Sequence, residues 1–123
     1  MAREILTAAD LVAARYGVIS EIRERIGFTA STTDAILVNN TPNRVQLVVV
    51  NLHATAQVYL RPLQPASTSN GIRLAPAGGF FKALWTEDLS LPAHEWHVIS
   101  DTVGAGLYIL ESLIRQAKDT EGE

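Results

Sequence analysis

The segment His94-Glu95-Trp96-His97 holds the closest grouping of side chains that could bind a metal ion. Zinc proteases place two histidines four residues apart on a helix, so that both rings face one ion. Here the separation is three, and Leu91-Pro92 just before the segment predicts a turn that leads into a strand. Side chains at positions 94 and 97 of a strand point to opposite faces. We therefore predict no metal site and no cofactor at these residues.

Other catalytic patterns do not occur in the sequence. It contains neither the His-x-His signature of cupins nor the Gly-x-Ser-x-Gly turn of serine hydrolases. Gly78-Gly79 lacks a following Lys-Ser/Thr pair and comes before a predicted strand, so it predicts a turn and not a phosphate-binding loop. The absence of cysteine excludes disulfides, thiolate nucleophiles and Cys-ligated zinc sites. We expect no catalytic residues and no enzyme activity.

Aromatic side chains could instead form a binding surface. Phe80 and Phe81 are neighbours on a predicted strand and must face opposite ways, so one of them points outward or into a partner. Aromatic residues dominate the buried area of small sandwiches, so we assign most of them to packing or subunit contact. Stacking on sugars is the alternative, and the candidates for these roles are Tyr59, Phe80, Phe81, Trp85, Trp96 and Tyr108.

Charged residues are few and scattered. The chain has 13 acidic and 10 basic residues, with a formal net charge of −3 and no lysine-rich run. Binding to a phosphate backbone needs clustered positive charge, so we expect no nucleic-acid partner. Four basic residues lie on separate predicted strands and indicate a solvated face or salt bridges between subunits: Arg44, Arg61, Arg73 and Lys82.

The length of 123 residues fits one domain with one core. The longest apolar stretch, residues 103–110, is much shorter than the ~20 residues that span a bilayer. Residues 1–16 carry scattered charges where a signal peptide would have an apolar run. We expect a soluble protein that is made in a reducing compartment and has no membrane partner.

Residues 7–26 have a helical pattern. Thr7 and Asp10 have the spacing of a capping box, and Gly27 could end the helix. Gly17 is unfavourable in mid-helix and could divide it into two pieces. We assign residues 1–33 to an N-terminal helical segment and linker. One apolar stripe is predicted at spacings of 7, 4 and 4, from Leu11, Val18, Ile22 and Ile26.

After residue 33 the chain changes to short strands separated by Gly, Pro, Asn and Ser. Because no helix is expected between the strands, this pattern predicts a mainly β fold, an antiparallel β-sandwich of seven to eight strands with a jelly-roll-like arrangement. We place the sandwich at residues 34–114 and a polar C-terminal tail at 115–123. The expected strands are 35–38, 44–52, 57–61, 71–74, 80–85, 88–91, 95–100 and 106–113.

The strand at 45–50 is apolar on both faces. Val45, Leu47 and Val49 alternate with Val48 and Val50. A strand of this kind is covered twice. We expect the opposing sheet on one side, and either the N-terminal helix or a neighbouring subunit on the other.

Residues 40–111 contain a series of short motifs. They are Asn-Thr-Pro-Asn-Arg followed by an apolar strand and Asn at 40–51, Val-Tyr at 58–59, Gly-Ile-Arg-Leu-Ala-Pro at 71–76, and Leu-Tyr-Ile-Leu-Glu at 107–111. In this order they resemble a β-sandwich module of tailed-phage virion proteins. Ala77 departs from the family's Pro-Gly hairpin by separating Pro76 from Gly78.

Several residues of this module also have a physical interpretation as turn formers. Pro42 suits the start of a strand, because it has no N–H for the ladder. Asn51 can end that strand by bonding nearby backbone. Asn70-Gly71 is a strong tight-turn pair, and Gly78 and Gly79 form the next turn.

The resemblance implies a non-enzymatic phage virion structural protein, a capsid-decoration protein or a head or tail accessory component. It would be made in the host cytoplasm and would form a trimer or ring bound to major capsid, neck or tail proteins. A glycan- or host-surface-binding module that uses Trp85, Trp96 and His97 stays open, as does a cupin-type metal enzyme. Deletion of residues 1–27 is expected to leave a folded sandwich that no longer assembles or attaches to a capsid. The candidate docking residues are Leu11, Val18, Ile22, Ile26, Phe80, Phe81 and Trp85.

Overall fold

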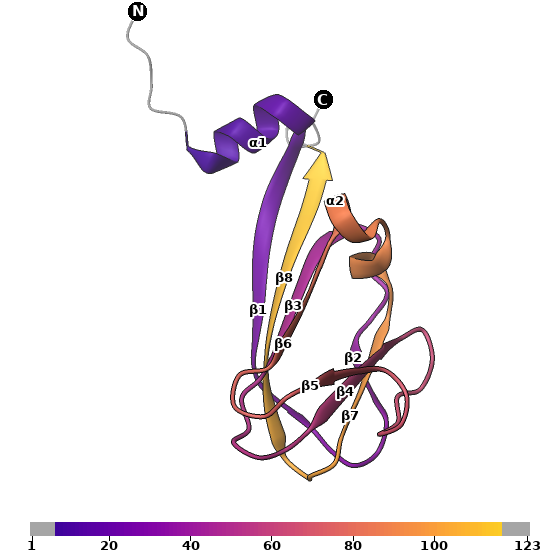
Figure 1. The fold of residues 1–123 in the computed structure, drawn as a ribbon. Helices are drawn as coiled ribbons and strands as arrows, with labels where there is room; N and C mark the ends of the chain where they lie inside the picture. Colours follow the sequence, from indigo (N-terminus) through magenta and orange to yellow (C-terminus); the bar gives the residue numbers. More distant parts are fainter. Residues whose placement is uncertain (1–6, 117–123) are drawn as a thin grey trace, which may run out of the picture.

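Strands bounded by turn-forming residues assemble into two antiparallel four-stranded sheets that pack face to face (Figure 1). This is seen in a computed structural model, which describes residues 7–116. The strand orders are β1-β8-β3-β6 and β2-β7-β4-β5. This arrangement confirms the predicted antiparallel β-sandwich. The strands are β1 (Val18–Ala30), β2 (Ala35–Val38), β3 (Arg44–Asn51), β4 (Val58–Pro62), β5 (Ile72–Leu74), β6 (Phe80–Leu84), β7 (Trp96–Ser100) and β8 (Ala105–Gln116), and the helices are α1 (Ala8–Tyr16), α2 (Trp85–Asp88) and the 3₁₀ turn η1 (Leu91–Ala93).

The pairing of the strands follows a simple rule. β1 pairs with β8, β2 with β7, β3 with β6 and β4 with β5, so the chain forms one long double ribbon that folds back on itself. Two further pairings, β3 with β8 and β4 with β7, close the ribbon into two sheets. This is the order of an eight-stranded jelly roll, a fold that serves many unrelated functions.

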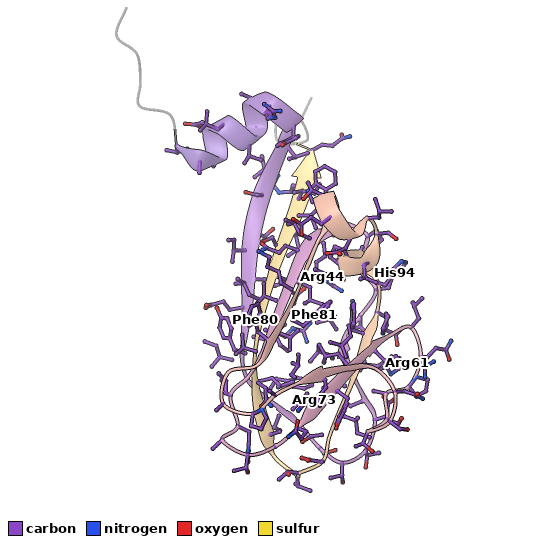
Figure 2. The ribbon with its side chains drawn as sticks, in the orientation of Figure 1. Arg44, Arg61, Arg73, Phe80, Phe81 and His94 are labelled. Atoms are coloured by element: carbon purple, nitrogen blue, oxygen red, sulfur yellow. The ribbon has the colours of Figure 1, made fainter. Side chains whose placement is uncertain are left out.

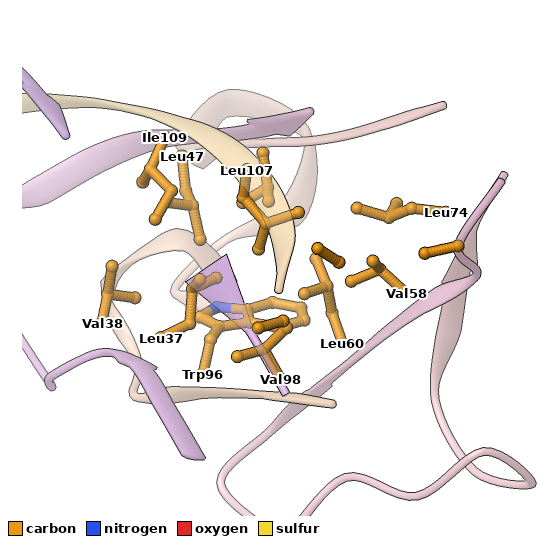
Figure 3. Close-up of a cluster of buried hydrophobic side chains, with 14 residues drawn as sticks. Leu37, Val38, Leu47, Val58, Leu60, Leu74, Trp96, Val98, Leu107 and Ile109 are labelled. Carbon is orange, nitrogen blue, oxygen red and sulfur yellow. The ribbon is translucent and has the colours of Figure 1, made fainter. Parts of the chain in front are cut away.

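The interior between the sheets is filled by apolar side chains (Figure 3). Trp96 lies at its centre and is fully buried, with its indole N–H donating to the Leu91 carbonyl at 3.1 Å. Phe81 packs on Trp96 with the ring centroids 4.9 Å apart. Side chains along β8 alternate between buried and half-buried, because every second one points into this core.

The N-terminal segment differs from the helix predicted for residues 7–26. Thr7 and Asp10 do form the expected capping box, but the helix ends at Gly17, which has a φ of +71°. Residues 18–30 form β1 instead. The spacing of Val18, Ile22 and Ile26 misled the prediction, because an interval of four matches one face of a strand as well as one face of a helix.

The prediction of helix over residues 18–26 is therefore wrong, and the sandwich begins at Val18 and not at residue 34. Gly27 does not stop a helix; it has a φ of +93° at a bulge where β1 opposes β8. Deletion of residues 1–27 would remove most of an edge strand, so it does not test docking by a helix.

Two smaller expectations also fail. The predicted strand at 88–91 is instead the turn between α2, which ends at Asp88, and η1, which begins at Leu91. Arg115 and Gln116, which we assigned to the tail, are the last residues of β8, paired with Ile19 and Val18. The rest of that tail, 117–123, lies outside the described residues, as do residues 1–6.

Candidate functional site

The sheet β1-β8-β3-β6 has one side that faces the second sheet and one that faces away from it, which we call the outer face. The register aligns its side chains in rows: Leu110 lies opposite Glu24 on one side and Val48 on the other, and Val48 lies opposite Lys82. The residues of the outer face are Val18, Ser20, Ile22, Glu24, Gln46, Val48, Val50, Phe80, Lys82, Leu84, Tyr108, Leu110, Ser112 and Ile114.

Apolar side chains occupy the middle of the outer face. Val48, Val50 and Leu110 are half-buried among their strand neighbours, whereas Ile22 and Phe80 at the margins are 67% and 66% exposed. The predicted two-sided cover of β3 is therefore present on the inner side only, within residues 7–116. This face is therefore the candidate for an interaction surface.

The N-terminal helix leaves the outer face largely open. α1 lies at the end of β1 and extends beyond the sheet (Figure 1). None of its residues is buried, and Leu11 is 53% exposed. Tyr16 at the end of α1 meets Trp85 edge to face, with the ring centroids 6.5 Å apart.

A groove of about 490 Å³ lies where α1, α2 and the end of this sheet meet. Val18 and Ile114 of the outer face line it, together with Val12 of α1 and Trp85 of α2. Its lining is mainly apolar, so its chemistry suits an apolar side chain of a partner.

A buried ionic cluster holds the inner side of the same sheet. Glu111 and Arg44 are each 1% exposed, and Arg44 Nη1 lies 3.7 Å from Glu111 Oε1. Burial lowers the pKa of Arg44 below its ordinary value, and the nearby guanidinium groups of Arg25 and Arg23 add to that effect while Glu111 opposes it. A guanidinium keeps its proton in proteins, so Arg44 is charged.

Arg44 also fixes loops to the sheet through backbone carbonyls. Its Nε donates to Pro92 at 2.9 Å, and its Nη2 donates to Asn39 at 2.7 Å and to His94 at 3.1 Å. The expectation that Arg44 belongs to a solvated face or an intersubunit salt bridge is therefore wrong. Figure 2 shows it among the strands, while Arg61 lies at the rim of the second sheet.

Two arginines of the edge strand share the same carboxylate. Arg23 Nη2 lies 3.5 Å and Arg25 Nε 3.4 Å from the oxygens of Glu111, and their side chains are 50% and 42% exposed. Three guanidinium groups thus face one carboxylate. Sequence reasoning missed this cluster, although the alternation of Glu111 with Leu107 and Ile109 was a signal that its carboxylate points inward.

The candidate docking residues do not lie on one surface. Val18, Ile22 and Phe80 lie on the outer face, and Trp85 is 47% exposed beside the groove. Ile26 is 80% exposed at the bulge of β1, and Leu11 lies on α1. Phe81 faces the core, so the two phenylalanines do point in opposite directions (Figure 2).

The histidine segment does not form one site. His94 follows η1 and its Nε2 lies 3.1 Å from Ser90 Oγ, whereas His97 lies on β7 between Asp34 and Glu95 at 3.1 and 3.0 Å. Within residues 7–116 no group of three or more potential ligands is placed to hold a metal ion. Trp96 is buried, so it is not available for the glycan-binding surface considered from the sequence.

The turn residues have specific structural positions. Asn51 is fully buried at the end of β3; its Nδ2 donates to the carbonyls of Ala56 and Ala75 at 2.8 and 3.1 Å, and its Oδ1 accepts from His53 N–H at 3.0 Å. Pro42 precedes β3, and Asn70 bonds back to Ser67. Glycine is required at two positions, since a Cβ at Gly71 or Gly79 would lie 2.4 Å from backbone atoms, while one at Gly78 would meet no atom within 4 Å.

No protein-family model and no curated protein matches the sequence. A solved protein of the disulfide-linked pili that form Bacillus endospore appendages is similar, with 10% identity and a TM-score of 0.47 over 80% of this chain and 88% of that chain. At this level the similarity carries no inference about function. The 123 residues of the sequence contain no cysteine, which excludes disulfide links through them. Among the described helices, none has the length and apolar character needed to cross a membrane.

Proposed function

We propose that the protein is a non-enzymatic structural subunit that binds neighbouring proteins of an assembly through its outer face. The observation that carries this proposal is the apolar character of that face, where Val48, Val50 and Leu110 form a central strip on the side without a covering sheet. Burial of apolar area stabilises a contact by about 25 cal/mol per Å². The strip would therefore form the apolar centre of a contact whose full size is about 800 Å² per partner.

The ionisable side chains support a structural role over a catalytic one. Arg44 and Glu111 connect two strands to the loops at Asn39 and Pro92. His97 is held between two carboxylates, those of Asp34 just before β2 and Glu95 just before β7. These contacts join neighbouring segments of the chain. Ser90 and His94 form a hydroxyl–imidazole pair, but no carboxylate contacts the His94 ring among the residues that the structure describes, so a catalytic triad is not formed there.

The setting we propose is the virion of a tailed phage, as a capsid-decoration or head or tail accessory component. The motifs at 40–51, 71–76 and 107–111 support it, because they resemble the sandwich module of such proteins. Symmetric assemblies of this kind bury apolar faces between copies or against a shell. The partners in this proposal are further copies of the chain and the capsid, neck or tail proteins.

The experiment combines particle composition with one surface variant. Purified particles from the source virus are analysed by quantitative mass spectrometry, and the chain is expected at a fixed stoichiometry to the major capsid protein. Particles assembled with Leu110→Lys are expected to lose the chain. Ile36→Lys is the control, since Ile36 is 47% exposed on β2 in the other sheet.

Two results would contradict the proposal. Absence of the chain from purified particles would refute the virion setting. Full occupancy of the Leu110→Lys chain, provided that its circular dichroism matches the wild type, would refute the outer face as the contact.

A further inference from the structure

Strand β1 is the edge of its sheet and is unusually long. It spans 13 residues and pairs only with β8 among the described strands. About half of the backbone N–H and C=O groups of an edge strand point away from its neighbour and offer a ladder to another strand. Residues 18–25 of β1 run without a bulge, which begins only after Arg25.

We propose that this free edge pairs antiparallel with β1 of a second copy, joining the two sheets into one eight-stranded sheet. A two-fold axis perpendicular to the sheet would pass through Ile22, so that residues whose numbers add to 44 lie opposite each other. This inference rests on the proposed function, because it takes one partner of the structural subunit to be a second copy of the same chain.

Charge selects this register. With the axis at Ile22, Glu21 of each copy lies opposite Arg23 of the other, and the two Ile22 residues lie opposite each other. Moving the axis by one residue would place Glu21 or Arg23 opposite its own copy. Like charges directly opposite each other destabilise a strand pair, and opposite charges stabilise it.

The ionic cluster supports the same arrangement. Arg23 and Arg25 lie on the inner side of β1 with half-exposed side chains and share the single carboxylate of Glu111 with Arg44. Glu21 lies on that same side and forms no ion pair within residues 7–116. In the paired edge, Glu21 of each copy supplies a second carboxylate to Arg23 of the other.

The outer faces add apolar contact. The axis keeps both outer faces on one side, so the exposed Ile22 side chains meet. Pairing over residues 19–25, which lie before the bulge, forms about seven backbone hydrogen bonds, one for each paired position. The doubled sheet then presents one continuous apolar surface to the rest of an assembly. α1 extends past this edge (Figure 1).

Site-directed disulfide formation tests the register directly, because the chain has no cysteine of its own. Ile22→Cys is expected to give a covalent dimer in high yield under mild oxidation, since opposed residues of an antiparallel pair have the Cα separation that a disulfide needs. Ile26→Cys is the matched control: it is more exposed on the same strand, but its two copies would be separated by eight residues of strand. Equal cross-linking of both variants, or none for Ile22→Cys in a folded protein, would overturn the proposal.

Sedimentation equilibrium of the full chain gives a second measurement. Wild-type protein is expected to show a reversible monomer–dimer equilibrium, and Glu21→Arg to raise the dissociation constant about tenfold by opposing like charges at two positions. Glu87→Arg, the same charge change on α2, is the control and is expected to leave it unchanged. A monomer at all concentrations, or equal effects of both variants, would refute the edge pairing.

The results separate this inference from the proposed function. Loss of Leu110→Lys from particles together with no Ile22→Cys dimer refutes the edge pairing and leaves the outer-face contact standing. An Ile22→Cys dimer of a chain that particles do not contain refutes the virion role and leaves the edge pairing standing.

Discussion

Arg44 and Glu111 face each other from β3 and β8, with Nη1 of the arginine 3.7 Å from Oε1 of the glutamate and both side chains shielded from solvent. Glu111 also contacts Arg23 and Arg25 on β1, so one carboxylate connects three strands of the sheet. Arg44 carries the connection onward to the loops at Asn39 and Pro92. This cluster lies beneath the outer face and holds its strands in register.

Removal of the charge of Glu111 is expected to be strongly destabilising. Glu111→Gln keeps the shape of the side chain but leaves Arg44 buried without a counter-charge, so we expect a loss of about 3–5 kcal/mol in the free energy of unfolding. Urea unfolding followed by circular dichroism measures it. Glu87→Gln, an exposed glutamate on α2, is expected to change stability by less than about 0.5 kcal/mol. Equal stability of the two variants would show that the carbonyl contacts of Arg44 suffice.

Asn51 is expected to be the most sensitive uncharged polar residue of the turns. Asn51→Ala leaves the buried carbonyls of Ala56 and Leu74 without their donor, which we expect to cost about 2–3 kcal/mol of unfolding free energy. Asn43→Ala is the control, because Asn43 donates one hydrogen bond to Ile114 at an exposed site. Thermal and urea unfolding compare the two, and a loss for Asn51→Ala no larger than that for Asn43→Ala would contradict the prediction.

Two glycines offer a comparison of close contact with backbone strain. Gly71 has a φ of +117° and a Cβ there would lie 2.4 Å from the Leu60 carbonyl oxygen, whereas Gly78 has a φ of +110° with open space around it. Both alanine variants are strained, but only Gly71→Ala also forces β4 to move. We expect Gly71→Ala to lose more stability than Gly78→Ala by at least about 1 kcal/mol, measured by urea unfolding. Equal losses would show that the backbone conformation alone decides.

Most of the sandwich could be predicted from the sequence, because its strands are bounded by local signals. The Asn-Thr-Pro-Asn turn before β3 and the Asn70-Gly71 pair before β5 act within a few residues. The segment 18–26 could not be assigned reliably, since an apolar interval of four fits both a helix face and a strand face.

The candidate surface could be predicted only in part, for a different reason. Apolar residues on both faces of β3 indicated a second covering layer, and the opposite directions of Phe80 and Phe81 followed from strand geometry. The cluster of Arg44 and Glu111 joins residues 67 positions apart, and no local pattern encodes a contact over such a separation.

Tyr108 offers a pH-dependent test of the outer face. Its hydroxyl donates a hydrogen bond to the carboxylate of Glu24 on β1, and this bond, with smaller contributions from desolvation and the negative charge, raises the pKa of Tyr108 above its ordinary value. A raised folded-state pKa means that the stabilisation is fully present below the unfolded value of about 10 and is lost as pH rises through the folded value. The contact therefore holds throughout the neutral range.

The absorbance of tyrosinate is titrated with pH in the wild type and in Tyr108→Phe, and the difference between the two curves isolates the ionisation of Tyr108. We expect Tyr108 to ionise above pH ~10 in the wild type and its pKa to fall toward the ordinary value in Glu24→Ala, because the acceptor is gone. Glu87→Ala is the control for a general loss of negative charge and is expected to leave the titration in place. An unchanged titration in Glu24→Ala would show that the hydrogen bond across β1 and β8 does not set the pKa of Tyr108.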